Sequence, residues 1–145
     1  MNTEQWFTFQ LANTWLAIEP SMVVTILDPQ HYVHLPLTPD HILGIIPHGQ
    51  SIIPILHLSL FLRMINSGQI DPQTHRVLIV KVKDMDVGIP IQVTGGVELV
   101  PVEKVSKNIL TKNGRLQDFL MGEFEGEQGL SGILDIGLVL ERARV

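Results

Sequence analysis

The stretch that decides the fold is GIIPHGQSIIPILHL, residues 44–58. Two apolar arms flank a short polar turn, a pattern typical of a β-hairpin. Gly49 is expected to supply the positive φ that such a turn needs. Pro54 interrupts the second arm and cannot donate to a strand ladder, so we expect this arm to lie at a sheet edge or to be bulged.

The composition of the whole chain agrees with a sheet protein. Thirty of the 145 residues are Ile or Val, and only three are Ala. β-branched side chains suit a pleated sheet, whereas Ala is the best helix former. The chain is 45% hydrophobic and 17% charged, which excludes a disordered tail. The composition therefore predicts an all-β fold with one or two short helices.

Hydrophobic alternation places the other strands along the chain. The expected strands are residues 7–11, 16–18, 22–27, 76–82, 87–93, 97–100 and 132–136. Short helices are expected at 57–65 and 138–142, with a helical turn in 103–110. Residues 28–41 form an expected irregular loop with several Pro and His, and 113–129 an exposed acidic loop. A weak echo between residues 17–27 and 88–100 is compatible with two related β units.

Several function classes are disfavoured by what the sequence lacks. There is no Cys, so we expect no disulfide, zinc knuckle or thiol nucleophile. No apolar run reaches the roughly 18 residues of a membrane span, and no signal peptide is expected. The net charge is -5 and the ten Lys and Arg are scattered, which argues against a nucleic-acid binder. These observations favour a soluble cytoplasmic protein.

No catalytic constellation is evident. Ser51 lies three residues from His48, but no acid is close in sequence to orient a base. No Ser occupies a G-x-S-x-G elbow. The Gly95-Gly96 pair is followed by neither Lys nor a predicted helix, so it is not a phosphate loop. We therefore expect no enzyme activity and no catalytic residues.

A metal site is the main chemical alternative. His31 and His34 are three residues apart, and Asp40 and His41 follow them. Zinc sites use side chains of these types. The loop is Pro-rich, however, so the spacing carries no helical geometry, and a solvated loop is favoured. A small-molecule or metal-binding β module remains open as an alternative, with no cofactor expected.

Two further groups of residues have a functional and a structural interpretation. Glu123, Glu125 and Glu127 alternate and could hold a cation, but a solvated acidic loop is favoured. Trp6 and Trp15 could anchor a partner, since aromatic residues are enriched at interface hot spots. Packing in or beside the core is the favoured interpretation of both.

The order of the segments resembles the CheW-like domain of bacterial chemotaxis coupling proteins. Residues 44–58 are similar to that family's signature of a Gly, a short apolar arm, Arg-Gly and a Pro-containing strand. Residues 7–11, 16–18, 23–27, 76–82, 87–93 and 133–140 resemble its other strands and its terminal helix. The resemblance covers nearly the whole chain.

The resemblance implies both a fold and a function. The fold is a single domain over residues 1–145 with two packed five-stranded SH3-like β-barrel subdomains. We expect their division near residues 70–76, with the N-terminal strand as a candidate for sharing between them. The function is that of a non-enzymatic adaptor, monomeric in isolation. It joins the regulatory domain of a CheA-type histidine kinase to the cytoplasmic tip of a chemoreceptor, in chemotaxis or a related motility pathway.

The resemblance also points to partner-binding residues. By position they are Val23, Thr25, Ile46, His48, Gly49 and Ile52. The apolar ones have core packing as their alternative interpretation. Three positions depart from the family pattern, because His48 replaces an Arg, Thr25 replaces an acid and Gln92 replaces an Asp. These departures predict an adaptor with weaker or redirected binding, or a degenerate paralogue that competes with a true coupling protein.

Overall fold

The computed structural model describes residues 2–145 and shows two five-stranded sheets with short helices. The predicted all-β, two-unit fold is therefore confirmed. The strands are β1 (Thr3–Leu11), β2 (Thr14–Ile18), β3 (Val23–Leu27), β4 (Ile42–His48), β5 (Ser51–Leu56), β6 (Arg76–Val82), β7 (Met85–Ile91), β8 (Val93–Pro101), β9 (Leu120–Gly126) and β10 (Gly129–Leu134). The helices are α1 (Leu58–Phe61) and α2 (Ile136–Ala143), with 3-10 turns η1 (Pro20–Met22), η2 (Val102–Lys104) and η3 (Leu116–Phe119).

The two sheets interleave in sequence. The first sheet has the order β8-β1-β2-β10-β9, and the second has the order β3-β6-β7-β5-β4. The expected division near residues 70–76 does not separate them, because β6 and β7 belong with β3 to β5, and β1 and β2 both join the C-terminal strands. Within the first sheet, β2 pairs in parallel with β10, and this pair connects the N-terminal strands to the C-terminal ones. An alternating pattern predicts that a segment is a strand but not which strand it pairs with.

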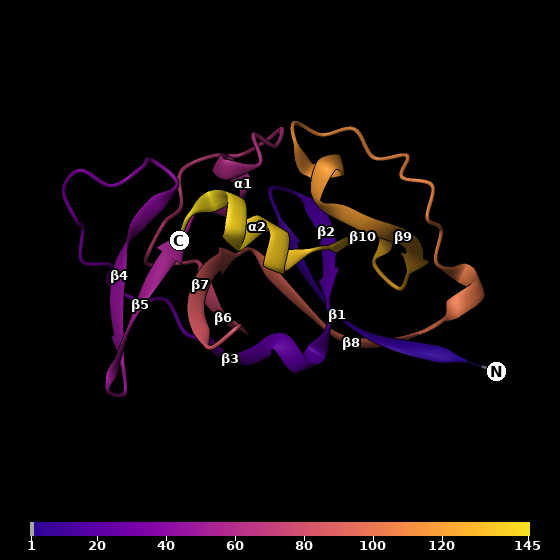
Figure 1. Cartoon of the computed structure of the whole chain (residues 1–145), viewed down its shortest axis with the longest axis horizontal. Helices are drawn as coiled ribbons and strands as arrows, with labels where there is room; N and C mark the ends of the chain where they lie inside the picture. The colour runs from indigo at the N-terminus through magenta and orange to yellow at the C-terminus, as the bar shows by residue number, and fades with distance from the viewer. Residues whose placement is uncertain (1) are drawn as a thin grey trace.

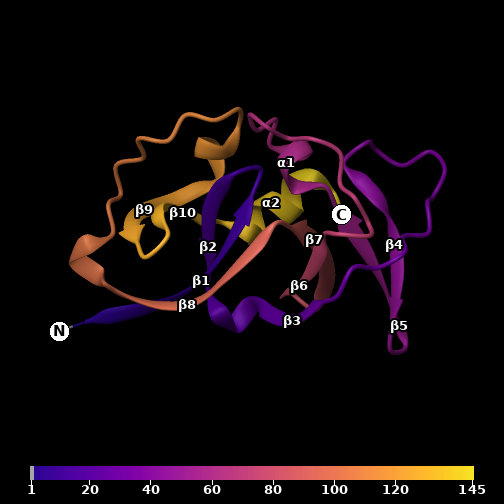
Figure 2. The ribbon, with the colours of Figure 1, turned by 180° about the vertical axis from the view of Figure 1, so that it is seen from behind.

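The two sheets lie side by side along the long axis of the molecule, with α2 between them (Figure 1; Figure 2 shows the reverse side). The main hydrophobic cluster draws on both. It includes Phe9 and Leu16 of the first sheet, Leu78 and Ile89 of the second, and Val139 of α2, all fully buried. Each sheet also has a smaller cluster of its own. The shared cluster holds the two β units together through apolar burial.

The hairpin predicted at residues 44–58 is confirmed. β4 and β5 pair antiparallel, and a two-residue turn separates His48 from Ser51. Gly49 has φ 60°, as the turn requires. Contrary to expectation, the bulge lies in β4, next to Gly44, and β5 is an interior strand. β5 tolerates Pro54 because it pairs with β7 at a single position, Ile55.

The acidic segment 113–129 departs most from expectation. It contains η3 and the strand β9, which pairs with β10 along the edge of the first sheet. The helical turn expected within 103–110 is limited to η2, and an extended loop follows. The alternating Glu residues of β9 misled the sequence interpretation, because one of them is covered by that loop.

The terminal helix is confirmed, with both ends capped. The carboxylate of Asp135 accepts a hydrogen bond from the Leu138 N–H at 3.1 Å, which satisfies one of the free donors of the first turn. At the other end, the Nε2 of His41 donates to the Ala143 carbonyl at 2.9 Å. This second contact ties α2, which follows β10 of the first sheet, to the start of β4 in the second.

Candidate functional site

The β4–β5 hairpin is the most prominent projection of the second sheet, at the left of Figure 1. Its two faces differ sharply. Ile46 pairs with Ile53 and is fully buried, whereas Ile52 pairs with Pro47 and is 69% exposed. Ile46 therefore supports the hairpin from inside and, in the isolated chain, offers no surface to a partner. Ile52 and Pro47 form an apolar surface at the edge of the sheet.

The tip of the hairpin is open. His48 is half-buried and Gly49 is exposed. A Cβ placed on Gly49 would meet nothing within 4 Å, so the space around the turn is free. The backbone of the tip is thus accessible, and His48 presents its imidazole where the family pattern has an Arg. The neutral imidazole has one N–H donor in place of the five of a guanidinium fork.

Val23 and Thr25 lie far from the hairpin in the sheet order. They belong to β3, at one edge of the second sheet, and β4 forms the other edge. Both are half-buried, and between them the register shifts and Val24 is 45% exposed. The structure therefore separates the six predicted residues into two groups. Sequence reasoning missed Val24, whose signal was its position in the edge strand.

Gln92, the third departure from the family pattern, has a structural role. Its side chain forms two hydrogen bonds with Asn13, in the tight turn between β1 and β2. The backbone N–H of Asn13 donates to Oε1 at 2.7 Å, and the Nε2 of Gln92 donates to Asn13 Oδ1 at 3.3 Å. Asn13 has φ 60°. An Asp side chain lacks the N–H donor of this pair, so the amide suits this turn.

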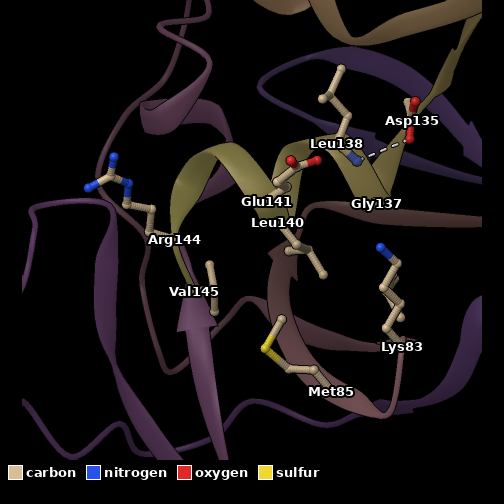
Figure 3. A pocket seen from close by; sticks show the side chains of 10 residues that line it. Lys83, Met85, Asp135, Gly137, Leu138, Leu140, Glu141, Arg144 and Val145 are labelled. Carbon is tan, nitrogen blue, oxygen red and sulfur yellow. Dashed lines mark hydrogen bonds between the residues drawn. The ribbon is translucent and has the colours of Figure 1, made fainter.

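A hollow with a volume of about 640 Å³ lies between α2 and the β6–β7 turn, as Figure 3 shows. Met85, Leu140 and Val145 give it apolar walls, and Lys83 and Glu141 are also among its lining residues. Within residues 2–145, neither charge belongs to an ion pair. One side of the hollow comes from the second sheet and the other from the helix that follows the first sheet. The hollow can accept an apolar side chain but contains no paired nucleophile and base.

The candidate metal ligands do not converge. Within residues 2–145, no three His, Cys, Asp or Glu side chains are grouped to hold a metal ion. His31 and His34 are exposed on the loop before β4. His41 instead binds the end of α2, and its ring meets that of Phe61 edge-on, with 5.2 Å between centroids. The described geometry therefore offers no support for the metal alternative.

The acidic residues and the tryptophans have different outcomes. Glu123 is only 3% exposed, so the prediction of a solvated acidic loop is wrong for this residue. Glu125 and Glu127 are exposed, as predicted. Trp6 is buried and Trp15 half-buried, which confirms packing in or beside the core.

One buried histidine was not singled out by the sequence. His57 precedes α1, and burial lowers its pKa from the ordinary value. Nearby His75 lowers the pKa further, and a hydrogen bond with the Gly68 backbone opposes both effects. The Nε2 of His57 has no partner among the described residues. A buried imidazole with one nitrogen left without a partner is a stability determinant whose pH dependence can be measured.

Other proteins share this arrangement. Within residues 2–145, the helices are all too short or too polar to cross a membrane. The fold is similar to the scaffolding protein TtCheW from Thermoanaerobacter tengcongensis, with a TM-score of 0.77 and 17% sequence identity, over 92% of this chain and 85% of that one. No curated protein sequence matches this chain. The family model described as CheW-like domain matches residues 5–144. Because that match covers nearly the whole sequence, this chain belongs to the CheW-like domain family.

Proposed function

We propose that this chain is a non-enzymatic cytoplasmic adaptor that couples a CheA-type histidine kinase to methyl-accepting chemoreceptors, in chemotaxis or a related motility pathway. Membership of the CheW-like family over residues 5–144 supports the class. The observation that carries the proposal is the projecting β4–β5 hairpin, which exposes an apolar side chain, Ile52, opposite the exposed Pro47.

The hairpin is the proposed contact for the regulatory domain of the kinase. Ile52 and Pro47 provide exposed apolar area near the end of the hairpin. The outer backbone of β4 is already paired at Ile45, which exchanges two hydrogen bonds with Val33, so we expect the partner to pack on these side chains rather than to add a strand. The open turn at His48 and Gly49 allows close approach of a partner backbone. Ile46 contributes indirectly, by holding the hairpin in place.

The β3 edge is the proposed contact for the receptor tip. An adaptor must hold two partners at once, so it needs two surfaces that do not overlap. β3 lies at the opposite edge of the second sheet from β4 and follows β2 through η1, at the junction between the two sheets. Val24 is exposed there, and Val23 and Thr25 flank it.

Two charge-introducing variants test this assignment. Binding of purified kinase regulatory domain and of a receptor cytoplasmic-tip fragment is measured in low-salt buffer for the wild type, Ile52→Glu and Val24→Glu. We expect Ile52→Glu to lose the kinase and keep the receptor, and Val24→Glu to do the reverse. Leu130→Glu, at an exposed apolar position of β10, is the matched control. Circular dichroism confirms folding. A folded wild type that binds neither partner would overturn the proposal.

A degenerate paralogue is the second candidate, and His48 is the observation that favours it. A chain that keeps the fold but lacks the guanidinium would bind one partner without joining the kinase to the receptor. Adding the chain to a reconstituted kinase–receptor complex distinguishes the two. An adaptor raises kinase association with receptors when the resident coupling protein is omitted. A competing paralogue lowers this association when the resident protein is present.

A further inference from the structure

A second, smaller hollow lies at one end of the first sheet, with a volume of about 220 Å³ and with no lining residue in β3 or in the β4–β5 hairpin. Trp6 lines it, and Val102 and Met121 add apolar surface. Its charged lining residues are Glu4, Glu19 and Lys107. Sites for drug-sized ligands span about 300–1,000 Å³. This hollow is smaller, and its size suits one long side chain.

The strand register explains why these side chains meet. Glu4 and Trp6 are two residues apart on β1, so they point to the same face of the sheet. Phe7 pairs with Ile18, the last residue of β2. Glu19, the next residue along, therefore lies beside Trp6. One indole thus has a carboxylate next to it along its own strand and a second one across from it.

Both carboxylates are free to bind. Within residues 2–145, neither Glu4 nor Glu19 takes part in a side-chain hydrogen bond or an ion pair, and both residues are exposed. Lys107 has no ion-pair partner either, so the three groups leave one net negative charge. Trp6 is 7% exposed, and its indole N–H is buried without an acceptor. A buried donor without an acceptor is unusual and marks an unfilled hydrogen-bonding position.

We propose that this hollow receives an arginine side chain of a protein partner. The aliphatic stem lies against Val102 and Met121, and the guanidinium stacks on the Trp6 indole between Glu4 and Glu19. Arginine suits this site better than lysine, because its planar fork stacks on aromatic rings and offers five donors to two separate carboxylates.

The two tryptophans provide the experiment. The probe is N-acetyl-arginine methylamide, titrated at millimolar concentration into ¹⁵N-labelled full-length chain while the two indole N–H signals are followed by NMR. A Trp15→Phe variant assigns them. We expect the Trp6 signal to shift and saturate, and the Trp15 signal to stay, because Trp15 does not line the hollow. The citrulline analogue, which has the same shape without the charge, should bind about tenfold more weakly.

Charge variants at the rim complete the test. Glu4→Gln and Glu19→Gln should each weaken binding about three- to fivefold. Lys107→Gln should strengthen it, and Glu125→Gln, an exposed carboxylate elsewhere on the sheet, should leave it unchanged. Equal shifts with arginine and citrulline, or a shift that survives both rim substitutions, would overturn the proposal. The result is independent of kinase and receptor binding, because no residue tested here belongs to the β4–β5 hairpin or to β3.

Discussion

The carboxylate of Glu123 accepts a hydrogen bond from the backbone N–H of Leu110 at 2.7 Å. Its other oxygen accepts from the N–H of Thr111 at 3.2 Å and from the Thr111 hydroxyl. A backbone bridge between Ser106 and Glu123 runs beside these bonds. One buried side chain on β9 therefore fixes the loop that follows η2 against the first sheet.

Glu123→Ala is expected to lower the free energy of unfolding by about 2–4 kcal/mol, because it removes a buried carboxylate that accepts three hydrogen bonds from partly buried donors. Glu123→Gln should be less severe, since one amide oxygen still accepts. Urea denaturation followed by fluorescence gives both values. Glu125→Ala, on the exposed face of the same strand, is the control and should change stability by less than about 0.5 kcal/mol. Equal effects at the two positions would contradict the role assigned to Glu123.

The same residue shows where sequence reasoning reached its limit. Residues 120–126, LMGEFEG, alternate between an apolar or small residue and a polar or exposed one, which is the strand signal. The charged positions suggested a solvated loop, because a carboxylate is seldom buried unless it is paired. The hydrogen-bonding partners of Glu123 come from residues 110 and 111, whose irregular backbone has no sequence signature. The strand could be predicted from its alternation, but the buried carboxylate could not.

Gly44→Ala is expected to destabilise the hairpin more than Gly49→Ala. Gly44 has φ 148°, and a Cβ there would lie 2.5 Å from the Val33 carbonyl oxygen. Gly49 has φ 60° with open space around it, so Ala there meets only the left-handed backbone penalty of about 1–2 kcal/mol. Thermal unfolding of the two variants checks the order. If Gly49→Ala proved as harmful as Gly44→Ala, steric contact with the 28–41 loop would not be the cause.

The hairpin itself was predictable, because its turn, its arms and its glycine are all local. Which face of the hairpin is buried could not be predicted, since Ile46 and Ile52 have the same side chain and lie in arms of similar composition. Only the pairing register, with Ile46 opposite Ile53 and Ile52 opposite Pro47, decides which one enters the core. The assignment of strands to the two sheets could not be predicted either, because the pairing of β2 with β10 joins segments more than a hundred residues apart.

Ile46→Ala and Ile52→Ala should therefore separate stability from binding. Ile46→Ala removes fully buried methyl and methylene groups and should lower the free energy of unfolding by about 2–4 kcal/mol. Ile52→Ala should leave stability within about 0.5 kcal/mol of the wild type but weaken kinase association. Denaturation and calorimetric titration measure the two effects. A stable Ile52→Ala protein with unchanged kinase affinity would move the contact away from this face of the hairpin.

His57 should make the protein less stable in mild acid. Burial lowers the pKa of folded His57 below its ordinary value of 6.5, so on acidification the unfolded chain takes up this proton first. The stability that the buried imidazole of His57 gives to the folded state is fully present above pH 6.5. It is lost as the pH falls from there toward the pKa of folded His57. One such proton gives a slope of at most about 1.4 kcal/mol per pH unit. His57→Gln should flatten the dependence between pH 7.5 and 5.5. His34→Gln, at an exposed site, should leave the pH dependence of stability unchanged. Equal slopes for the wild type and His57→Gln would exclude His57 as the cause of the acid sensitivity.

His48→Arg should strengthen binding of the kinase regulatory domain. The tip of the hairpin is open, so a longer side chain fits without disturbing the core. If the guanidinium meets an acceptor on the partner, the charged hydrogen bond adds about 1–3 kcal/mol, or roughly 5- to 150-fold in Kd. His31→Arg adds the same charge on an exposed loop outside the hairpin and corrects for general electrostatic attraction.

A gain in kinase affinity at position 48 alone would mean that the family interface is retained and only weakened in this chain. Equal gains in both variants would mean that the partner responds to net charge, and no gain at position 48 would mean that the hairpin meets its partner through apolar contacts, with Ile52 at their centre.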